Sequence, residues 1–173
     1  EYWLAQLVFG LIYAVIGGGL MLLAGFTGQF SLGHAAFVGV GAYAQAVLTN
    51  AGLPLPLAMV CAALLAAAAG VVVGLPALRL KGIYLGIATL AFGFIVEEIF
   101  ARWESVTGGN AGMHVKAPAI FGWSIDSGEG FYFICLITAV LATLAIVNLL
   151  RSSTGRAFVA IRDSEVSAQS MGI

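Results

Sequence analysis

The residues best able to contact a solute lie in a polar interruption between two apolar runs, at residues 25–34. In lipid, irregular backbone persists only where protein or water satisfies its polar groups, so this interruption points to a buried or water-lined position. A tight turn in which Thr27 or Ser31 caps a helix is the alternative interpretation. The residues of this segment that we expect to line a substrate pathway are Thr27, Gln29, Ser31, Gly33 and His34.

A second glycine-dense segment, residues 107–112, follows a long apolar run. Turn chemistry alone explains glycines of this kind, but their backbone groups could also line an external mouth. The candidate residues there are Thr107, Gly109 and Asn110. Just upstream, Glu97 and Glu98 stand about 100° apart on a helix, and Arg102 is placed to pair with Glu98 at i+4. Ionisable groups in a membrane are often functional, whereas an interfacial position is the simpler explanation.

The last stretch, residues 151–173, has the pattern of two short helices. Its Ser/Thr run can cap the first helix, Asp163 can cap the second, Glu165 suits the second helix's opening turn and Gly172 can end it. Phe158 and Ile161 share one face between cations, which suits docking onto another protein or onto lipid head groups. A linker lying on the membrane surface is the alternative.

Motifs for enzymatic chemistry are missing from the sequence. Residues 30–33 resemble a nucleophile elbow, but Gln29 occupies the position of its first glycine. No P-loop, HExxH motif or paired-carboxylate pattern is present, so the chain itself should neither bind ATP through a P-loop nor hydrolyse a substrate. Cys61 and Cys135 lie in apolar runs without metal-ligand spacing, and we expect no metal and no cofactor.

The composition requires lipid as the surrounding medium. Hydrophobic residues make up 61% of the 173 residues, charged residues 9%, and the mean hydropathy is +1.06. A soluble domain carries about 25% charged residues. The net charge of −1 also provides no basic surface for nucleic acid.

Apolar runs of membrane-spanning length recur along the chain. We predict an all-α fold, a polytopic transmembrane helix bundle of about five spans followed by short cytoplasmic helices. Four spans are clear, and the fifth is short enough to be a half helix within a discontinuous span. The clear spans are residues 3–24, 55–78, 83–101 and 131–150, and the short one is residues 35–49.

Lysines and arginines in short loops indicate the orientation, because they are retained on the cytoplasmic side. Five fall on one side of a five-span topology, whereas the other side has only Arg102 and Lys116. We therefore expect Glu1 outside, residues 1–150 as a membrane core and residues 151–173 in the cytoplasm. The five cytoplasmic cations are Arg79, Lys81, Arg151, Arg156 and Arg162.

Four segments together carry a family resemblance: GQFSLGHAAFVGVGAY at residues 28–43, LRLKGIYLGIATLAFG at 78–93, TGGNAG at 107–112 and the stretch 151–173. In order and spacing the chain resembles the permease subunits of bacterial ABC importers of the branched-chain amino acid type, the LivM family. The resemblance covers nearly the whole chain.

The resemblance implies a non-enzymatic subunit in the bacterial inner membrane. It would pair with a homologous permease subunit, receive a small-molecule substrate from a periplasmic binding protein, and be driven by separate ATP-binding cassette subunits. It also implies that about half of a full-length permease lies beyond Ile173. The residues that would couple the chain to the ATPase are Gly155, Arg156, Phe158, Ile161, Arg162, Asp163 and Glu165.

Three alternatives remain at the level of sequence. Relatives commonly have an acidic and then a basic residue after the glycine that corresponds to Gly93, whereas this chain has Phe94 and later Glu97 and Glu98. A permease for urea or short amides in the same family is therefore one alternative. A gradient-driven secondary transporter or channel is the second, although it would not need the loop of residues 151–173. A membrane scaffold without transport is the third.

Overall fold

The computed structural model describes residues 2–80, 82–116, 119–120, 123–124, 128–170 and 172. Several residues used above lie outside these ranges, so the expected positions of Glu1, Lys81 and Ile173 are not addressed by the structure. The same holds for the side chain of Glu165.

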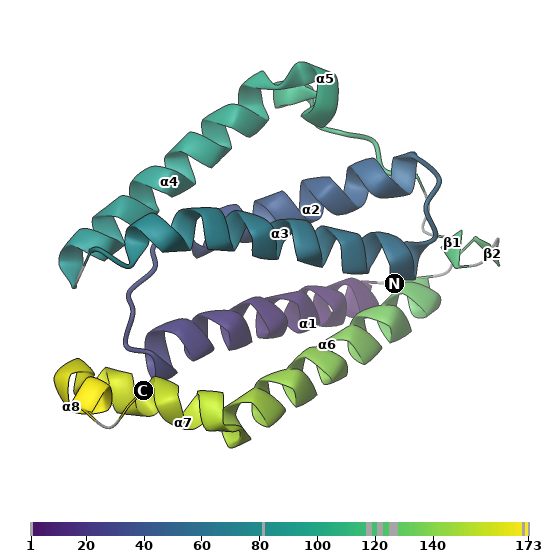
Figure 1. Ribbon diagram of the computed structural model, residues 1–173. Helices are drawn as coiled ribbons and strands as arrows, with labels where there is room; N and C mark the ends of the chain where they lie inside the picture. Colours follow the sequence, from purple (N-terminus) through teal and green to yellow (C-terminus); the bar gives the residue numbers. More distant parts are fainter. Residues whose placement is uncertain are drawn as a thin grey trace. The chain divides into compact units, whose positions relative to one another are not determined.

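The described chain is helical almost throughout, which confirms the predicted all-α class (Figure 1). Two strands of two residues each pair antiparallel, with Ala119 opposite Ser124, and were not predicted. The long helices are α1 (Tyr2–Leu20), continued by the π-helix η1 (Met21–Phe26), α2 (His34–Asn50), α3 (Leu55–Ala77), α4 (Ile83–Arg102) and α6 (Gly128–Arg151). The short elements are α5 (Glu104–Thr107), the 3₁₀-helix η2 (Gly109–Ala111), β1 (Ala119–Ile120), β2 (Trp123–Ser124), α7 (Ser153–Asp163) and α8 (Glu165–Ser170).

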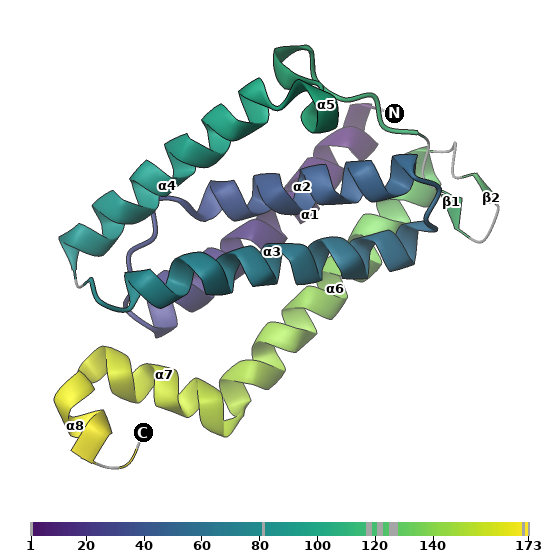
Figure 2. The same ribbon diagram turned by 45° about the horizontal axis from the view of Figure 1, so that its top comes forward.

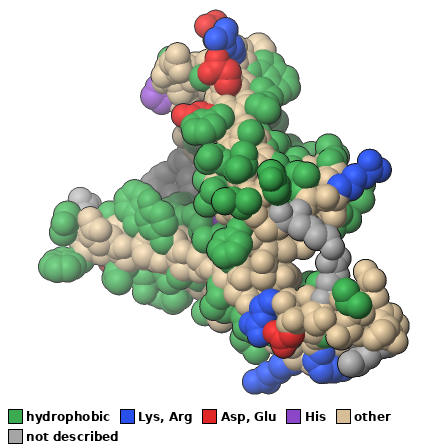
Figure 3. All heavy atoms as spheres, turned by 90° about the vertical axis from the view of Figure 1, so that its left-hand side faces the viewer, with side chains coloured by type: hydrophobic (Ala, Val, Ile, Leu, Met, Phe, Trp, Pro, Cys, Tyr) green, Lys and Arg blue, Asp and Glu red, His purple; other side chains and the backbone are tan. Residues whose placement is uncertain are grey.

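Four helical stretches in the described chain are long and apolar enough to cross a membrane, and they match the four clear predicted spans. On the face shown in Figure 3, hydrophobic side chains are spread over the helices, and charged side chains stand in a few separate groups. Helix α2 has 17 residues, a length of about 26 Å at 1.5 Å per residue, which is short for the hydrocarbon core. The four stretches are Tyr2–Phe26, Leu55–Ala77, Ile83–Arg102 and Gly128–Arg151.

The helices form two compact units, one of residues 1–30 and 127–173 and the other of residues 31–126. In the first unit, α1 and α6 lie side by side and run parallel (Figures 1 and 2). A Cβ placed on Gly18 would be 3.1 Å from Cδ1 of Ile146. Farther along both helices, Gly25 at the end of η1 accepts a hydrogen bond from Arg162 of α7. The carboxyl end of the first span therefore lies beside α7.

In the second unit, α2 packs antiparallel to α3 and parallel to α4. Phe37 stacks on Phe92 with ring centroids 5.3 Å apart, and Tyr43 lies near Phe100 at 4.5 Å. Small side chains allow α2 and α3 to approach closely. The buried alanines of these two helices are Ala36, Ala46, Ala58 and Ala62.

The directions of α1 and α6 indicate whether α2, the short predicted span, crosses the membrane. Since α1 and α6 are parallel, the chain between them must cross the membrane an odd number of times. Helices α3 and α4 provide two crossings, and we infer that α2 provides the third. The alternation of α2, α3 and α4 within the second unit agrees with this count, which gives five spans.

The end of the described chain forms two helices, as predicted, but one predicted cap is wrong. Ser152 caps α7, its Oγ accepting from the amide of Gly155 at 3.4 Å. Asp163 is the last residue of α7 and does not cap α8. Ser164 does, because its extended backbone frees its Oγ to accept from the amide of Ser167 at 3.3 Å. Gly172 lies just beyond α8 with φ +82°.

Candidate functional site

Helix α2 begins where its chain presses against the middle of α4. A Cβ on Gly33 would stand 2.0 Å from the carbonyl oxygen of Thr89, so only glycine fits there. The amide of Leu32 donates to Oγ1 of Thr89 at 3.0 Å, and that hydroxyl donates to the carbonyl of Gly86 at 2.9 Å. No side chain caps the start of α2, whereas Thr27 follows the end of η1 and its hydroxyl donates to the carbonyl of Leu23.

This contact places irregular backbone beside α4, a helix long and apolar enough to cross a membrane. Thr89 is six residues beyond Ile83, the first residue of α4, which corresponds to about 9 Å along the helix axis. Residues 31–33 are not helical. Backbone groups surrounded by lipid need a protein partner, and the buried Thr89 hydroxyl provides one for the amide of Leu32. Residues 27–33 form no regular structure and are called the broken segment below, and their end at Leu32 and Gly33 is held against α4.

A cavity of about 510 Å³ opens between α2 and α4 from this point toward η2. Its size falls within the range of small-molecule sites. The lining is mainly apolar, with Glu97, Asn110 and Tyr43 as its polar side chains. The lining residues are Leu32, Gly33, Ala35, Ala36, Gly39, Tyr43, Leu90, Gly93, Phe94, Val96, Glu97, Phe100, Ala101, Gly109 and Asn110.

Thr107 supports the end of this cavity at η2, although it is not among the lining residues. It is 1% exposed, and its hydroxyl donates toward the carbonyls of Phe100 and Trp103 at 2.6 and 2.8 Å. The same oxygen accepts from the amide of Gly109 at 3.2 Å. Thr107 thereby fixes η2 to the end of α4 and holds Gly109 against the cavity.

Three of the predicted pathway residues meet in this cavity: Gly33, Gly109 and Asn110. Ser31 and His34 are half-buried at the start of α2 but are not among its described lining. Thr27 and Gln29 belong to the other unit, where Thr27 Oγ1 donates to the carbonyl of Leu23 at 2.5 Å.

Sequence reasoning did not identify Tyr43, Gly93 or Phe100 as cavity residues. Two parallel helices bring them together, and nothing in the local sequence predicts that pairing. Glu97 lines the cavity, whereas the sequence singled out Glu97 and Glu98 together and favoured an interfacial position for both.

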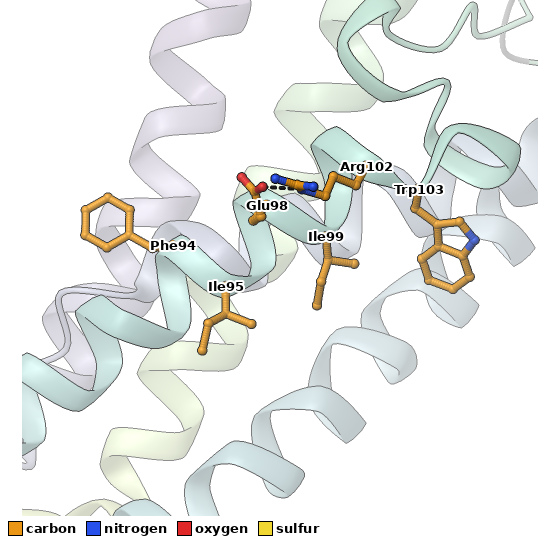
Figure 4. Close-up of a pocket in the computed structure, with 6 residues that line it drawn as sticks. All are labelled: Phe94, Ile95, Glu98, Ile99, Arg102 and Trp103. Atoms are coloured by element: carbon orange, nitrogen blue, oxygen red, sulfur yellow. Dashed lines mark hydrogen bonds and ion pairs between the residues drawn. The ribbon is translucent and has the colours of Figure 1, made fainter.

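The other side of α4 carries the predicted Glu98–Arg102 ion pair, which the structure confirms (Figure 4). Both side chains are more than half exposed. They border a shallow apolar groove, in which Ile95, Ile99 and Trp103 are each about half exposed. An exposed pair of this kind contributes little to stability. Glu97 and Glu98 thus face different surroundings.

At the other end of the chain, Gly155 forms the corner between α6 and α7. It is buried, and a Cβ there would stand 2.3 Å from the carbonyl oxygen of Leu150. Arg156 is exposed and donates to the carbonyl of Arg151 at 3.2 Å. Both residues, predicted to contact a partner, therefore also set the angle at which α7 leaves the span.

The predicted docking face of α7 is partly free. Phe158 is half-buried, whereas Ile161 is 39% exposed. Arg162 forms hydrogen bonds to Asp163 at 3.0 and 3.1 Å and to the carbonyl of Gly25 at 3.0 Å. Over the described residues, no three His, Cys, Asp or Glu side chains form a group that could hold a metal ion.

Four helical stretches long and apolar enough to cross a membrane define a polytopic α-helical membrane protein. Residues 2–173 match the family described as the branched-chain amino acid transport system / permease component. The chain belongs to this family, as the sequence resemblance implied.

Relatives in bacteria and an archaeon agree with this assignment. The chain is 35% identical to the "High-affinity branched-chain amino acid transport system permease protein LivM" of Escherichia coli (strain K12) and 34% identical to that of Salmonella typhimurium, covering 94% of this chain and 44% of each relative. It is 30% identical to the "Probable branched-chain amino acid transport permease protein LivM" of Methanocaldococcus jannaschii, over 94% of this chain and 49% of that protein. The chain thus spans less than half the length of these relatives. No solved structure matches it.

Proposed function

We propose that the chain forms part of the transmembrane permease subunit of an ATP-driven importer that moves branched-chain amino acids inward. The cavity between α2 and α4 is the observation that carries this proposal. Its walls suit an aliphatic side chain, and the Glu97 carboxylate and Asn110 amide suit the charged end of an amino acid. The names of the relatives favour the same substrate class.

In this proposal the cavity is the outer section of the pathway. Gly109 and Asn110 form its mouth, and the broken segment before α2 forms its inner end. Glu97 binds the substrate ammonium group, since a carboxylate and an ammonium make a strong charge-assisted hydrogen bond. The other predicted pathway residues do not line the cavity but lie in or next to the backbone that borders it. They are Thr27, Gln29, Ser31, His34 and Thr107.

The proposal has residues 1–150 as the membrane core of a bacterial inner-membrane protein, with Glu1 outside and residues 151–173 in the cytoplasm. A homologous permease subunit completes the pathway, and a periplasmic binding protein delivers the substrate. Separate ATP-binding cassette subunits hydrolyse ATP, so this subunit is not itself an enzyme. They contact α7 and α8 through the residues from Gly155 to Glu165 predicted above.

The test is solute uptake by the full-length complex in proteoliposomes that contain ATP or a non-hydrolysable analogue. Leucine uptake that requires ATP and the binding protein is the expected result. Uptake of urea or acetamide without leucine uptake would indicate the amide alternative, and uptake driven by an ion gradient alone would indicate a secondary transporter. Either of these outcomes, or no uptake, would overturn the proposal.

A further inference from the structure

A contact between residues 137 positions apart joins α7 to the end of the first span. Nη1 of Arg162 donates to the carbonyl oxygen of Gly25 at 3.0 Å. Gly25 lies in the last turn of η1, where carbonyl groups have no partner within the helix. A cation at a helix carboxyl end also interacts favourably with the helix dipole. The Arg162 side chain of α7 thus completes the capping of the first span.

Neighbouring groups close the rest of this helix end. The carbonyl of Leu23 accepts from Oγ1 of Thr27 at 2.5 Å and from the amide of Gln29 at 3.3 Å. The chain therefore turns back on the helix at residues 27–29, directly beside the Arg162 contact. The carbonyl of Gly25 depends on Arg162, whereas that of Leu23 is satisfied locally.

Arg162 is held on both sides. Its Nε and Nη2 donate to Oδ1 of Asp163 at 3.1 and 3.0 Å, which orients the guanidinium. On the other side, Gly28 has φ +69°, and a Cβ there would be 2.8 Å from Cγ of Arg162. The Arg162 stem therefore packs where a side chain at position 28 would have to lie. Gly28 is required both by its left-handed backbone and by this contact.

We propose that Arg162 is the positioning residue that transmits movement of α7 to the broken segment of residues 27–33. A displacement of α7 acts through the guanidinium on the end of η1, and the chain continues from there, without regular structure, to Gly33 and the cavity. This inference rests on the proposed function, because it assumes that ATP-binding subunits move α7. Lysine is a poor substitute, because its single ammonium group cannot reproduce the two guanidinium hydrogen bonds to Asp163 while also donating to the carbonyl of Gly25.

The experiment uses the full-length complex in proteoliposomes and measures ATP hydrolysed per leucine transported. We expect Arg162→Gln to raise this ratio at least about fivefold, the factor that corresponds to the lower end of typical coupling free energies. For Arg162→Lys we expect a ratio between that of the wild type and that of Arg162→Gln. Arg79→Gln is the matched control, because it removes an exposed arginine from the loop after α3. It should leave the ratio unchanged.

A second measurement does not depend on transport. Hydrogen exchange at the amide of Gln29, which donates to Leu23, should accelerate in Arg162→Gln and in Gly28→Ala but not in Arg79→Gln. If the wild type transports leucine and Arg162→Gln lowers only the amount of assembled complex, with an unchanged ratio, Arg162 is merely structural and the inference is wrong. Unchanged exchange at Gln29 would also overturn it. A wild type without uptake would instead contradict the proposed function.

Discussion

The carbonyl of Thr89 occupies the space where a side chain at Gly33 would begin, since a Cβ there would stand 2.0 Å from the carbonyl oxygen. Gly33→Ala must therefore separate the start of α2 from α4. We expect it to cost about 3 kcal/mol, the upper range for overpacking, and to abolish uptake. Gly41→Ala on the same helix is the control, because its new Cβ would be 3.9 Å from that of Ala66.

Thermal denaturation of the purified complex and leucine uptake are the measurements for this pair. The melting temperature should fall for Gly33→Ala and remain unchanged for Gly41→Ala. Equal effects of the two substitutions would show that the close approach at Thr89 does not hold the broken segment in place.

Sequence reasoning succeeded where the signal is local. Apolar runs long enough for a bilayer predicted the four clear spans, and the i+4 spacing predicted the Glu98–Arg102 pair. It failed where a partner comes from far along the chain. Thr89 reads as an ordinary span residue, and only its contact with Leu32, 57 positions away, shows why the broken segment is tolerated.

The misassigned cap has a different cause. Asp163 and Ser164 are adjacent, and both residue types favour the cap position. The choice between them depends on where α7 ends, and helix boundaries are poorly specified by sequence. Asp163 is the last residue of α7 and bonds Arg162, so Ser164 takes the cap position before α8.

Glu97 and Glu98 differ in surroundings although they are adjacent. Glu97 lines the cavity, whereas Glu98 pairs with exposed Arg102 on the other side of α4. Glu97→Gln should raise the KM for leucine uptake by about tenfold to a hundredfold, as expected for loss of a charge-assisted hydrogen bond. Glu98→Gln should change it less than about threefold, because exposed pairs contribute little. Concentration-dependent uptake by both variants measures the difference, and a larger effect at Glu98 would rule out the assigned role of Glu97.

Asn50 joins the end of α2 to the loop that follows η2. Its Nδ2 donates to the carbonyl of His114 at 2.9 Å, and its Oδ1 accepts from the amide of Lys116 at 3.0 Å. Asn50→Ala should remove about 1–2 kcal/mol of local stability, the value of two ordinary hydrogen bonds. Exchange of the Lys116 amide would then accelerate about tenfold, since 1.4 kcal/mol is a factor of ten. Asn50→Asp retains the acceptor for Lys116 and should show a smaller increase. Unchanged exchange in Asn50→Ala would contradict the contact.

Gly155 has no room for a side chain at the corner between α6 and α7. A Cβ there would be 2.3 Å from the carbonyl oxygen of Leu150 and 2.5 Å from its Cα. In the proposed importer, Gly155→Ala should change the direction of α7 and reduce recovery of the complex with ATP-binding subunits by about tenfold, a loss of about 1.4 kcal/mol. Gly10→Ala, where no atom lies within 4 Å of the new Cβ, is the control. Co-purification of the subunits measures the effect, and normal recovery of Gly155→Ala would show that the corner does not orient α7.

Ile161 offers the most direct test of docking through α7, because it is 39% exposed whereas Phe158 is half-buried. Ile161→Asp should leave the helix intact but place a carboxylate in the interface, where an unpaired charge is costly. We expect ATP-driven leucine uptake to fall about tenfold or more, equivalent to at least about 1.4 kcal/mol. Ile161→Leu keeps the apolar volume and should transport normally. Membrane insertion of each variant is checked by its yield in the membrane fraction. Because Ile161→Asp changes only an exposed side chain, full uptake by a normally inserted variant would mean that the ATP-binding subunits contact a different surface.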